Sequence, residues 1–230
     1  MSARQFYIVL ALSVIAMKMQ KLPSLVSGQL GKDAWVLFGV YGLINLIGIL
    51  FVFFIFKHID LKTVLKPSKN IFFNILRFIL MFVTLIYFLV QAILVYEHVQ
   101  GLFANTLFDD LSWSFFSLLL LFAVFFLAHR GIENIALNFE LFTWIIVVSF
   151  ALLSIFGAVQ TDYSVILPLD TINFKNVLSQ LKTFNCWFGD FFLILYLGIK
   201  AREIKLSKTL WVYSASMLFT ILLGVIGASI

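Results

Sequence analysis

Four residues unsuited to a lipid-facing helix interrupt the first apolar stretch of the chain: Lys18, Gln20, Lys21 and Pro23. The apolar run before them, residues 5–17, would form a helix of about 20 Å at roughly 1.5 Å per residue. Because the hydrocarbon core of a membrane is about 30 Å thick, a crossing segment must include the four interrupting residues. Proline removes a backbone donor and disfavours helix in the residue before it. The pattern predicts a helix broken near the membrane midplane, with free backbone groups lining a cavity. The alternative is a short, tilted helix whose lysines extend to the outer surface.

Gly189 and Asp190 interrupt a second apolar segment, residues 185–199, which is short for a span. An acidic residue inside a span indicates a functional site, whereas the alternative here is an acid in water at the outer end of the segment. Interrupted spans in corresponding positions of two halves indicate the binding site of a transporter, and a five-helix repeat would make segments 5–29 and 185–199 correspond. We therefore predict that unwound backbone at Lys18–Pro23 and near Gly189 supplies hydrogen bonds to a ligand.

Three further polar residues are candidates in or beside apolar segments: Glu133, Glu140 and Gln91. The two glutamates are seven residues apart and share a helix face. Glu133 is predicted at the inner membrane surface, whereas Glu140 lies deeper and should face the bundle or water. Glu140 is interpreted as a proton carrier, as the partner of a buried lysine, or as one side of a structural interhelical hydrogen bond. Gln91 is a candidate ligand contact, with packing between helices as the alternative.

Motifs typical of enzymes are missing from the sequence. It has no GxxxxGK[ST] phosphate-binding loop and no HExxH zinc motif. The three histidines, His58, His98 and His129, lie in separate predicted loops on both sides of the membrane, so they cannot form one metal site. The single cysteine, Cys186, excludes an intramolecular disulfide and a multi-cysteine metal site. We therefore expect no cofactor, no metal site and no enzymatic activity.

The composition indicates which element type must position these residues. The hydrophobic fraction is 63% and the charged fraction 12%, whereas soluble domains are roughly 45–50% apolar and about 25% charged. A water-soluble fold of 230 residues could not bury so much apolar surface, so the sequence predicts an all-α integral membrane protein. Seven segments are apolar enough to be candidate spans: 5–29, 34–56, 71–97, 112–128, 137–158, 185–199 and 209–229.

The distribution of lysine and arginine predicts the orientation of these spans. With the N-terminus in the cytoplasm, three basic residues fall on the outer side (Lys32, Lys175 and Lys182), and eleven fall on the inner side. This bias follows the positive-inside rule. The orientation in the membrane therefore explains the net charge of +5, and nucleic-acid binding is not needed to explain it. The inner set is Arg4, Lys57, Lys62, Lys66, Lys69, Arg77, Arg130, Lys200, Arg202, Lys205 and Lys208.

Several short stretches, in this order, resemble the spore-germination permease family, the B subunits of nutrient germinant receptors within the amino acid–polyamine–organocation superfamily. The resemblance covers essentially the whole chain, and RGIENIA at a loop-to-helix junction is its most specific motif. One departure is Leu137 after Ala136, where the family often has an arginine following the alanine. The stretches are SARQFYIVLALSV, LPSLVSGQLGKDAW (Leu22–Trp35), RGIENIA (Arg130–Ala136), ILPL (Ile166–Leu169) and FGD (Phe188–Asp190).

The resemblance implies a LeuT-like helical bundle with discontinuous helices one and six. Residues 1–230 would be a single transmembrane domain, in which 1–158 form the first five-helix repeat and 185–230 the first two helices of a second, inverted repeat. Members of the family usually have about ten spans, so the expected fold is incomplete with about seven. The chain is therefore interpreted as a fragment of a longer protein or as a degenerate member.

The resemblance also implies a function and partners. The expected protein is a permease-like subunit that binds or senses a small nutrient such as an amino acid. It would sit with A-type and lipoprotein C-type subunits in the inner membrane of an endospore-forming bacterium. In this scheme Lys18 or Lys21 replaces a coupling cation or holds a ligand carboxylate. One alternative is an amino acid–proton symporter with Glu140 or Asp190 as the carrier. The other is a non-transporting structural subunit.

Overall fold

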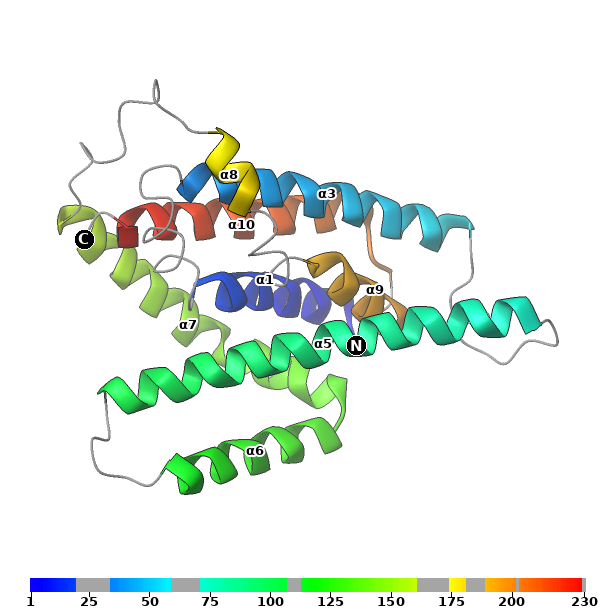
Figure 1. The fold of residues 1–230 in the computed structure, drawn as a ribbon, viewed down its shortest axis with the longest axis horizontal. Coiled ribbons are helices and arrows are strands. Elements are labelled where there is room, and N and C mark those ends of the chain that lie inside the picture. Colours follow the sequence, from blue (N-terminus) through cyan, green and yellow to red (C-terminus); the bar gives the residue numbers. More distant parts are fainter. Residues whose placement is uncertain are drawn as a thin grey trace.

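The fold is an assembly of helices, shown in Figure 1. It comes from a computed structural model that describes residues 1–19, 34–58, 71–106, 113–160, 174–180, 189–201 and 203–228. Each of the seven apolar segments predicted from the sequence overlaps a helix in these ranges, and the short helix α8 lies in the connection between the fifth and sixth segments. The helices are α1 (Ala3–Met19), α3 (Ala34–His58), α5 (Ile71–Thr106), α6 (Trp113–His129), α7 (Ile132–Gln160), α8 (Phe174–Gln180), α9 (Asp190–Lys200) and α10 (Leu206–Ala228).

Four of the described helices contain stretches long and apolar enough to cross a membrane. These stretches are Trp35–His58, Ile71–Glu97, Ile132–Ser149 and Leu206–Leu223. Helices α1 and α6 have 17 residues each, and α9 has 11. At roughly 1.5 Å per residue these three reach about 26, 26 and 17 Å, which is less than a full crossing. The count of seven spans therefore stays a prediction, whereas the all-helical class is confirmed for the described ranges.

Helix α1 begins with a reciprocal pair of hydrogen bonds between Ser2 and Gln5. The Ser2 N–H donates to Gln5 Oε1 at 3.0 Å, and the Gln5 N–H donates to Ser2 Oγ at 3.2 Å. This is a capping box, which satisfies backbone donors that would otherwise lack partners at the start of a helix. From this start α1 runs through the middle of the bundle, where it packs against α7, α9 and α10 (Figure 1).

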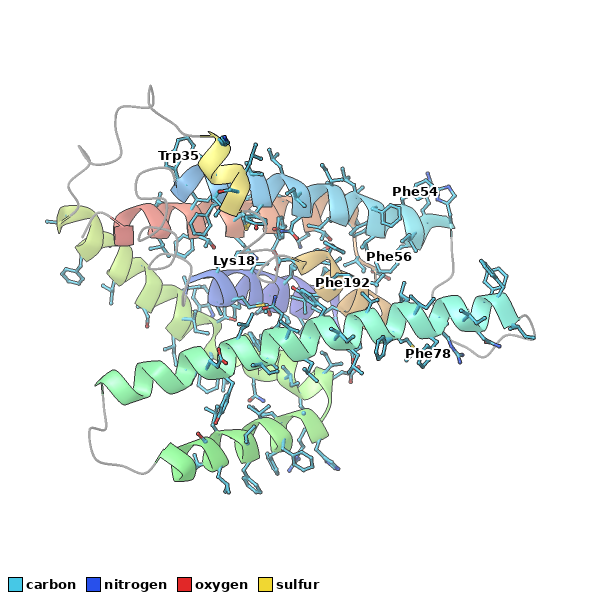
Figure 2. All side chains as sticks on the ribbon, in the orientation of Figure 1. Lys18, Trp35, Phe54, Phe56, Phe78 and Phe192 are labelled. Carbon is cyan, nitrogen blue, oxygen red and sulfur yellow. The ribbon has the colours of Figure 1, made fainter. Side chains whose placement is uncertain are left out.

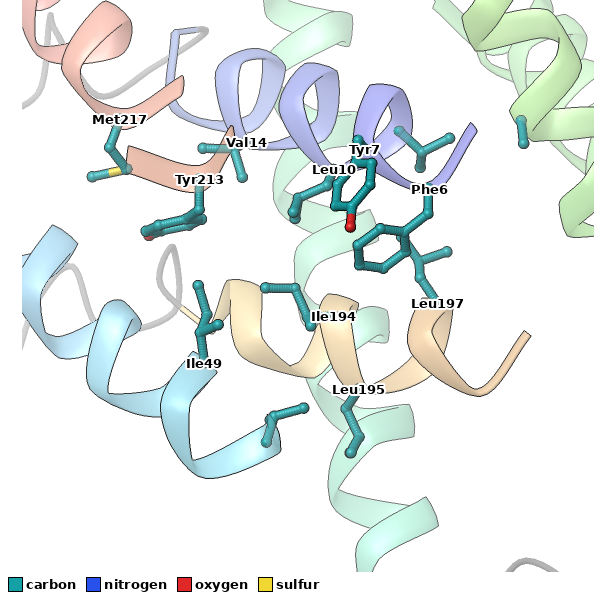
Figure 3. Close-up of a cluster of buried hydrophobic side chains, with 13 residues drawn as sticks. Phe6, Tyr7, Leu10, Val14, Ile49, Ile194, Leu195, Leu197, Tyr213 and Met217 are labelled. Atoms are coloured by element: carbon teal, nitrogen blue, oxygen red, sulfur yellow. The ribbon is translucent and has the colours of Figure 1, made fainter. Parts of the chain in front are cut away.

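The hydrophobic core surrounds α1 (Figure 3). Phe6, Leu10 and Val14 are spaced four residues apart and are completely buried, so they form one stripe along the helix. Side chains from α3, α9 and α10 pack onto the same cluster, and Ala136 adds a contact from α7. The further members of this cluster are Tyr7, Val9, Ile49, Val52, Ile194, Leu195, Leu197, Tyr213 and Met217.

Two glycines allow α3 and α9 to approach closely. A Cβ added at Gly48 of α3 would lie 2.6 Å from the Phe191 ring, and one added at Gly198 of α9 would lie 2.7 Å from the Phe56 ring. Small residues at contact points are the usual way for membrane helices to pack, because packing replaces the hydrophobic effect as the attractive force in lipid. The short helix α9 is thereby held against α3.

Helices α5, α6 and α7 present large apolar side chains on their exposed faces. Phe78, Phe125 and Trp144 are all exposed, and Figure 2 shows Phe78 on the outside of α5. Contiguous apolar surface of this extent would not be stable in water. These faces suit contact with lipid, as the composition of the chain predicts.

Candidate functional site

A buried ion pair joins the last turn of α1 to the first residue of α9. Lys18 Nζ lies 2.5 Å from Asp190 Oδ2. Lys18 is 0% exposed and Asp190 is 1% exposed. The two residues are 172 positions apart in sequence, so only the tertiary fold brings them together. Figure 2 labels Lys18 near the centre of the bundle.

Two further helices hold Asp190 in place. The Tyr213 hydroxyl of α10 donates to Asp190 Oδ2 at 2.9 Å. The backbone N–H of Asp190 donates to Asn45 Oδ1 of α3 at 3.2 Å. Asn45 is itself fixed, because its Nδ2 donates to the Tyr41 carbonyl at 3.1 Å. Lys18 and Tyr213 therefore meet at the Asp190 carboxylate, while Asn45 holds the Asp190 backbone. We call Lys18, Asn45, Asp190 and Tyr213 the Lys18–Asp190 cluster.

Gly189 sets the start of α9 and brings Asp190 into the cluster. Its φ of +152° is disfavoured for residues with a Cβ. A Cβ added there would also lie 2.6 Å from the Tyr87 ring of α5. Backbone conformation and available space therefore both require glycine at this position.

The electrostatic arrangement is favourable at both helix ends. Lys18 is in the last turn of α1, and Asp190 is in the first turn of α9. A cation near a helix C-terminus and an anion near a helix N-terminus both oppose the helix dipole. Each buried charge also faces its opposite, so the cluster has no net charge. A buried pair is expensive to form and strongly destabilising to break on one side only.

Aromatic side chains of α5 border the start of α9, and Gln91 lies on the same face of α5. Tyr87 packs on Phe192 of α9 with ring centroids 5.0 Å apart, and Phe88 lies 6.0 Å from Tyr196. Gln91 is 2% exposed and follows Tyr87 by four residues, so both lie on one face of α5. The structure thus places Gln91 inside the bundle, on the face that contacts α9.

Glu133 and Glu140 of α7 lie beside the start of α1, away from the Lys18–Asp190 cluster. Glu140 Oε1 is 3.0 Å from Arg4 Nε, and Glu133 Oε1 is 2.9 Å from the ammonium group of Met1. Gln5 Nε2 also donates to Glu140 at 3.5 Å. Arg4 and Lys18 are 14 positions apart on α1, which corresponds to roughly 21 Å. The partner of Glu140 is therefore an exposed arginine and not a buried lysine, and the structure does not bring the glutamates to the cluster.

The predicted break in the first segment is corrected in part. Lys18 and Met19 are helical, because α1 is continuous from Ala3 to Met19, so the expected unwinding at Lys18 is wrong. The Lys18 side chain also turns inward to Asp190 instead of extending to a surface. The predicted site residues Gln20, Lys21 and Pro23 lie outside the described residues.

Two members of the cluster, Asn45 and Tyr213, were not predicted from the sequence. Asn45 had a usable signal, since it is an amide side chain in the middle of the apolar run 34–56. Tyr213 had none, because tyrosine is common near membrane interfaces and its partner lies on another helix. Within the described ranges, no group of three or more His, Cys, Asp or Glu side chains could hold a metal ion.

Comparison with known proteins identifies the family of the chain. Neither the curated proteins nor the solved structures include a match. The model of one protein family, described as "Spore germination protein", matches residues 1–228. This match spans all the described helices and agrees with the resemblance found in the sequence. With its long apolar helices, the chain is a multi-pass, permease-like membrane protein, and it belongs to the spore germination protein family.

Proposed function

We propose that this chain is the permease-like subunit of a spore nutrient germinant receptor and that it binds or senses a small nutrient such as an amino acid. Its site is the Lys18–Asp190 cluster, to which Gln91 of α5 is proposed to contribute. Gly189 shapes the site through its backbone, and Gln20, Lys21 and Pro23 are proposed to contribute from the segment that follows α1. Glu133 and Glu140, at the other end of α1, are proposed to take part in proton or ion coupling.

The buried Lys18–Asp190 pair is the observation that carries this proposal. Ionisable residues within membrane segments are rare and usually mark ligand or ion pathways. Here the pair joins two short helices, α1 and α9, whose segments the sequence singles out as interrupted. A purely structural contact between these helices would not need charge, because apolar residues of similar volume often stabilise as well as a buried ion pair does.

Membership of the family supports a proposal for the wider setting of the site. We propose a LeuT-like arrangement in which α1, α3, α5, α6 and α7 belong to a first repeat, and α9 and α10 begin an inverted second one. The N-terminus would lie in the cytoplasm, and the chain would act with A-type and C-type receptor subunits in the inner membrane of an endospore.

A neutral version of the pair tests the proposed site. Spores carrying Lys18→Met together with Asp190→Asn should lose nutrient-triggered germination while the receptor stays at its normal level in the membrane. The double change avoids leaving one buried charge without its partner. Ser216→Ala is the matched control. Ser216 lies on α10 and is buried like the pair, but its hydroxyl donates only to the Val212 carbonyl of its own helix.

The possible results separate the functions considered. An unchanged nutrient response in the double variant would show that ligand is not sensed at this pair. Uptake of amino acid driven by a pH gradient in proteoliposomes would instead favour a symporter. Normal co-purification of the other subunits with no measurable nutrient binding by the wild-type receptor would favour a structural subunit.

A further inference from the structure

The start of α10 carries two ammonium groups that no carboxylate offsets. Lys205 directly precedes α10 and Lys208 lies in its first turn, and both side chains are exposed. Like charges at about this spacing repel each other. Glu203 is exposed nearby, but among the described residues neither lysine forms an ion pair with it or with any other carboxylate. The two lysines therefore leave an excess of positive charge on the surface.

The other carboxylates at this end of the bundle already have partners. Glu140 pairs with Arg4, and Glu133 pairs with the ammonium group of Met1. Both acids belong to α7 and both are held by the start of α1. The charge that would offset the two lysines of α10 must therefore come from outside the described part of the chain.

Buried side chains fix the backbone that carries the two lysines. The Tyr7 hydroxyl of α1 accepts from the Lys205 N–H at 3.0 Å, and the Thr209 hydroxyl donates to the Lys205 carbonyl at 3.0 Å. Tyr7 and Thr209 are both buried. Lys208 Nζ lies 4.7 Å from the centre of the Tyr7 ring. One tyrosine thus positions both lysines, and their ammonium groups extend from a well-packed base.

An exposed apolar stripe continues from the two lysines along α10. Trp211 and Leu218 are exposed and lie seven residues apart, and the exposed Leu222 follows one turn later, so the three share one helix face. They lie within the apolar stretch Leu206–Leu223, which is long enough to cross a membrane. At roughly 1.5 Å per residue, Leu218 is about 15 Å from Lys208 along the helix, which is half of a hydrocarbon core of about 30 Å. The face therefore has the length of one leaflet.

We propose that the start of α10 binds an anionic phospholipid in the leaflet at this end of the bundle. Lys205 and Lys208 contact its phosphate and acidic headgroup, as basic residues beside a membrane span do. Trp211 lies at the level of the glycerol backbone, where indole side chains concentrate, and Leu218 contacts one acyl chain.

An anionic phospholipid fits this surface because it joins a negative charge to an apolar chain of leaflet length. A soluble anion would leave the apolar side chains of Trp211 and Leu218 uncovered. A phospholipid with no net charge would leave the excess charge of the two lysines in place. The charge and the apolar stripe together therefore specify the class of ligand.

Native mass spectrometry of the purified full chain tests this surface. The protein is titrated separately with dioleoyl phosphatidylglycerol and with dioleoyl phosphatidylcholine, which have the same acyl chains but differ in net charge, and the bound lipids are counted. We expect phosphatidylglycerol to bind at least about tenfold more tightly, the scale expected for two basic residues at a membrane surface.

Matched double variants locate this preference on the protein. Lys205→Gln together with Lys208→Gln should reduce the preference for phosphatidylglycerol to within about threefold. Lys57→Gln together with Arg130→Gln removes the same charge from two other exposed residues, at the end of α3 and in the α6–α7 turn, and should keep the preference. Lys205→Arg together with Lys208→Arg keeps the charge and should also keep the preference, which separates loss of charge from misfolding.

Three results would overturn the proposal. Equal binding of the two lipids by the wild-type chain would show that the surface does not select an anionic headgroup. Equal losses in the two glutamine double variants would assign the preference to the overall charge of this end and not to α10. A dimer that Trp211→Ala dissociates would assign the face to a second copy of the chain. None of these results tests the proposed nutrient site, which lies at the other end of α1.

Discussion

At the scale of single residues, the Asp190 carboxylate determines the stability of the cluster. Asp190→Asn would keep the shape of the side chain but leave the buried Lys18 ammonium facing a neutral group. We expect the free energy of unfolding to fall by about 3–5 kcal/mol, because breaking one side of a buried pair leaves the other charge uncompensated. Unfolding of the purified protein in mixed micelles, followed by circular dichroism, measures this loss.

Two other substitutions on α10 calibrate that loss. Tyr213→Phe removes one hydrogen bond to a charged acceptor and should cost about 2 kcal/mol. Ser216→Ala removes a hydroxyl that donates only to its own helix and should change stability by less than about 0.5 kcal/mol. If Asp190→Asn were no more destabilising than Ser216→Ala, the carboxylate would not be paired as the structure shows.

Gly189 has a different constraint, since its backbone conformation and its surroundings both exclude a side chain. Gly189→Ala should destabilise the protein by about 1–3 kcal/mol from backbone strain alone, with the contact to the Tyr87 ring in addition. A second change, Tyr87→Leu, should recover only the part due to that contact. Gly39→Ala is the control, because nothing lies within 4 Å of its added Cβ, and it should be neutral or slightly stabilising. Equal effects at Gly189 and Gly39, measured by the same unfolding experiment, would contradict the structure at the start of α9.

At the scale of elements, α1 carries ion pairs of opposite character at its two ends. Arg4, which pairs with Glu140, has a side chain that is 75% exposed, whereas the Lys18 side chain is 0% exposed. Exposed pairs contribute about 0–1 kcal/mol and are screened by salt, but buried pairs are screened much less. Arg4→Gln should therefore lower the unfolding temperature slightly at low salt and have no effect at high salt. The effect of Asp190→Asn on the unfolding temperature should be the same at low and at high salt. A large salt dependence for this variant would contradict the burial of the pair.

The elements also show what could be predicted from the sequence. The helices could be predicted because long apolar runs in lipid form helices, whose backbone groups are all hydrogen-bonded internally. The shortness of the first apolar run also predicted correctly that Lys18 does not face lipid. The extent of α1 did not follow, since a proline at position 23 allows the helix to end anywhere in the preceding turn. Composition therefore identifies the helices, while their ends depend on contacts between them.

The site was predictable only in part, for a related reason. Lys18 and Asp190 each stood out as a charge in an apolar segment, but neither segment indicates that the other supplies its partner. Glu140 stood out equally and pairs with an exposed arginine instead. Asn45 enters the site because α3 packs against α9, with glycine contacts such as Gly48 with Phe191. Tyr213 enters it because α10 packs against α1 and α3. A single sequence shows which residues need partners but not which residues provide them.

At the scale of the whole molecule, three segments far apart in sequence gather around the start of α1. Met1 pairs with Glu133 near the start of α7, and the Lys205 N–H between α9 and α10 donates to the Tyr7 hydroxyl at 3.0 Å. Lys208 also lies 4.7 Å from the centre of the Tyr7 ring. The N-terminus, the α6–α7 turn and the α9–α10 connection therefore share one end of the bundle. Alternating spans would place the same three segments on one side of the membrane, and the lysine and arginine bias predicts that this side is the cytoplasm.

This arrangement predicts which positions a membrane-impermeant thiol reagent reaches. The substitutions His129→Cys and Ser207→Cys are made in a Cys186→Ser background, and both positions are exposed near the shared end. These two cysteines should react only when the reagent has access to the cytoplasmic face. A cysteine at Lys175 in α8, also exposed, should react from outside intact cells, because the positive-inside rule places its segment there. Labelling of intact cells and of inside-out vesicles, quantified on gels, measures how accessible each cysteine is from the outer and from the cytoplasmic face. If His129 and Ser207 were labelled from opposite faces, the number of crossings between them would be odd and the shared end would be wrong. If both reacted only from outside, the bundle would stand as described with its orientation reversed, and the positive-inside rule would fail for this chain.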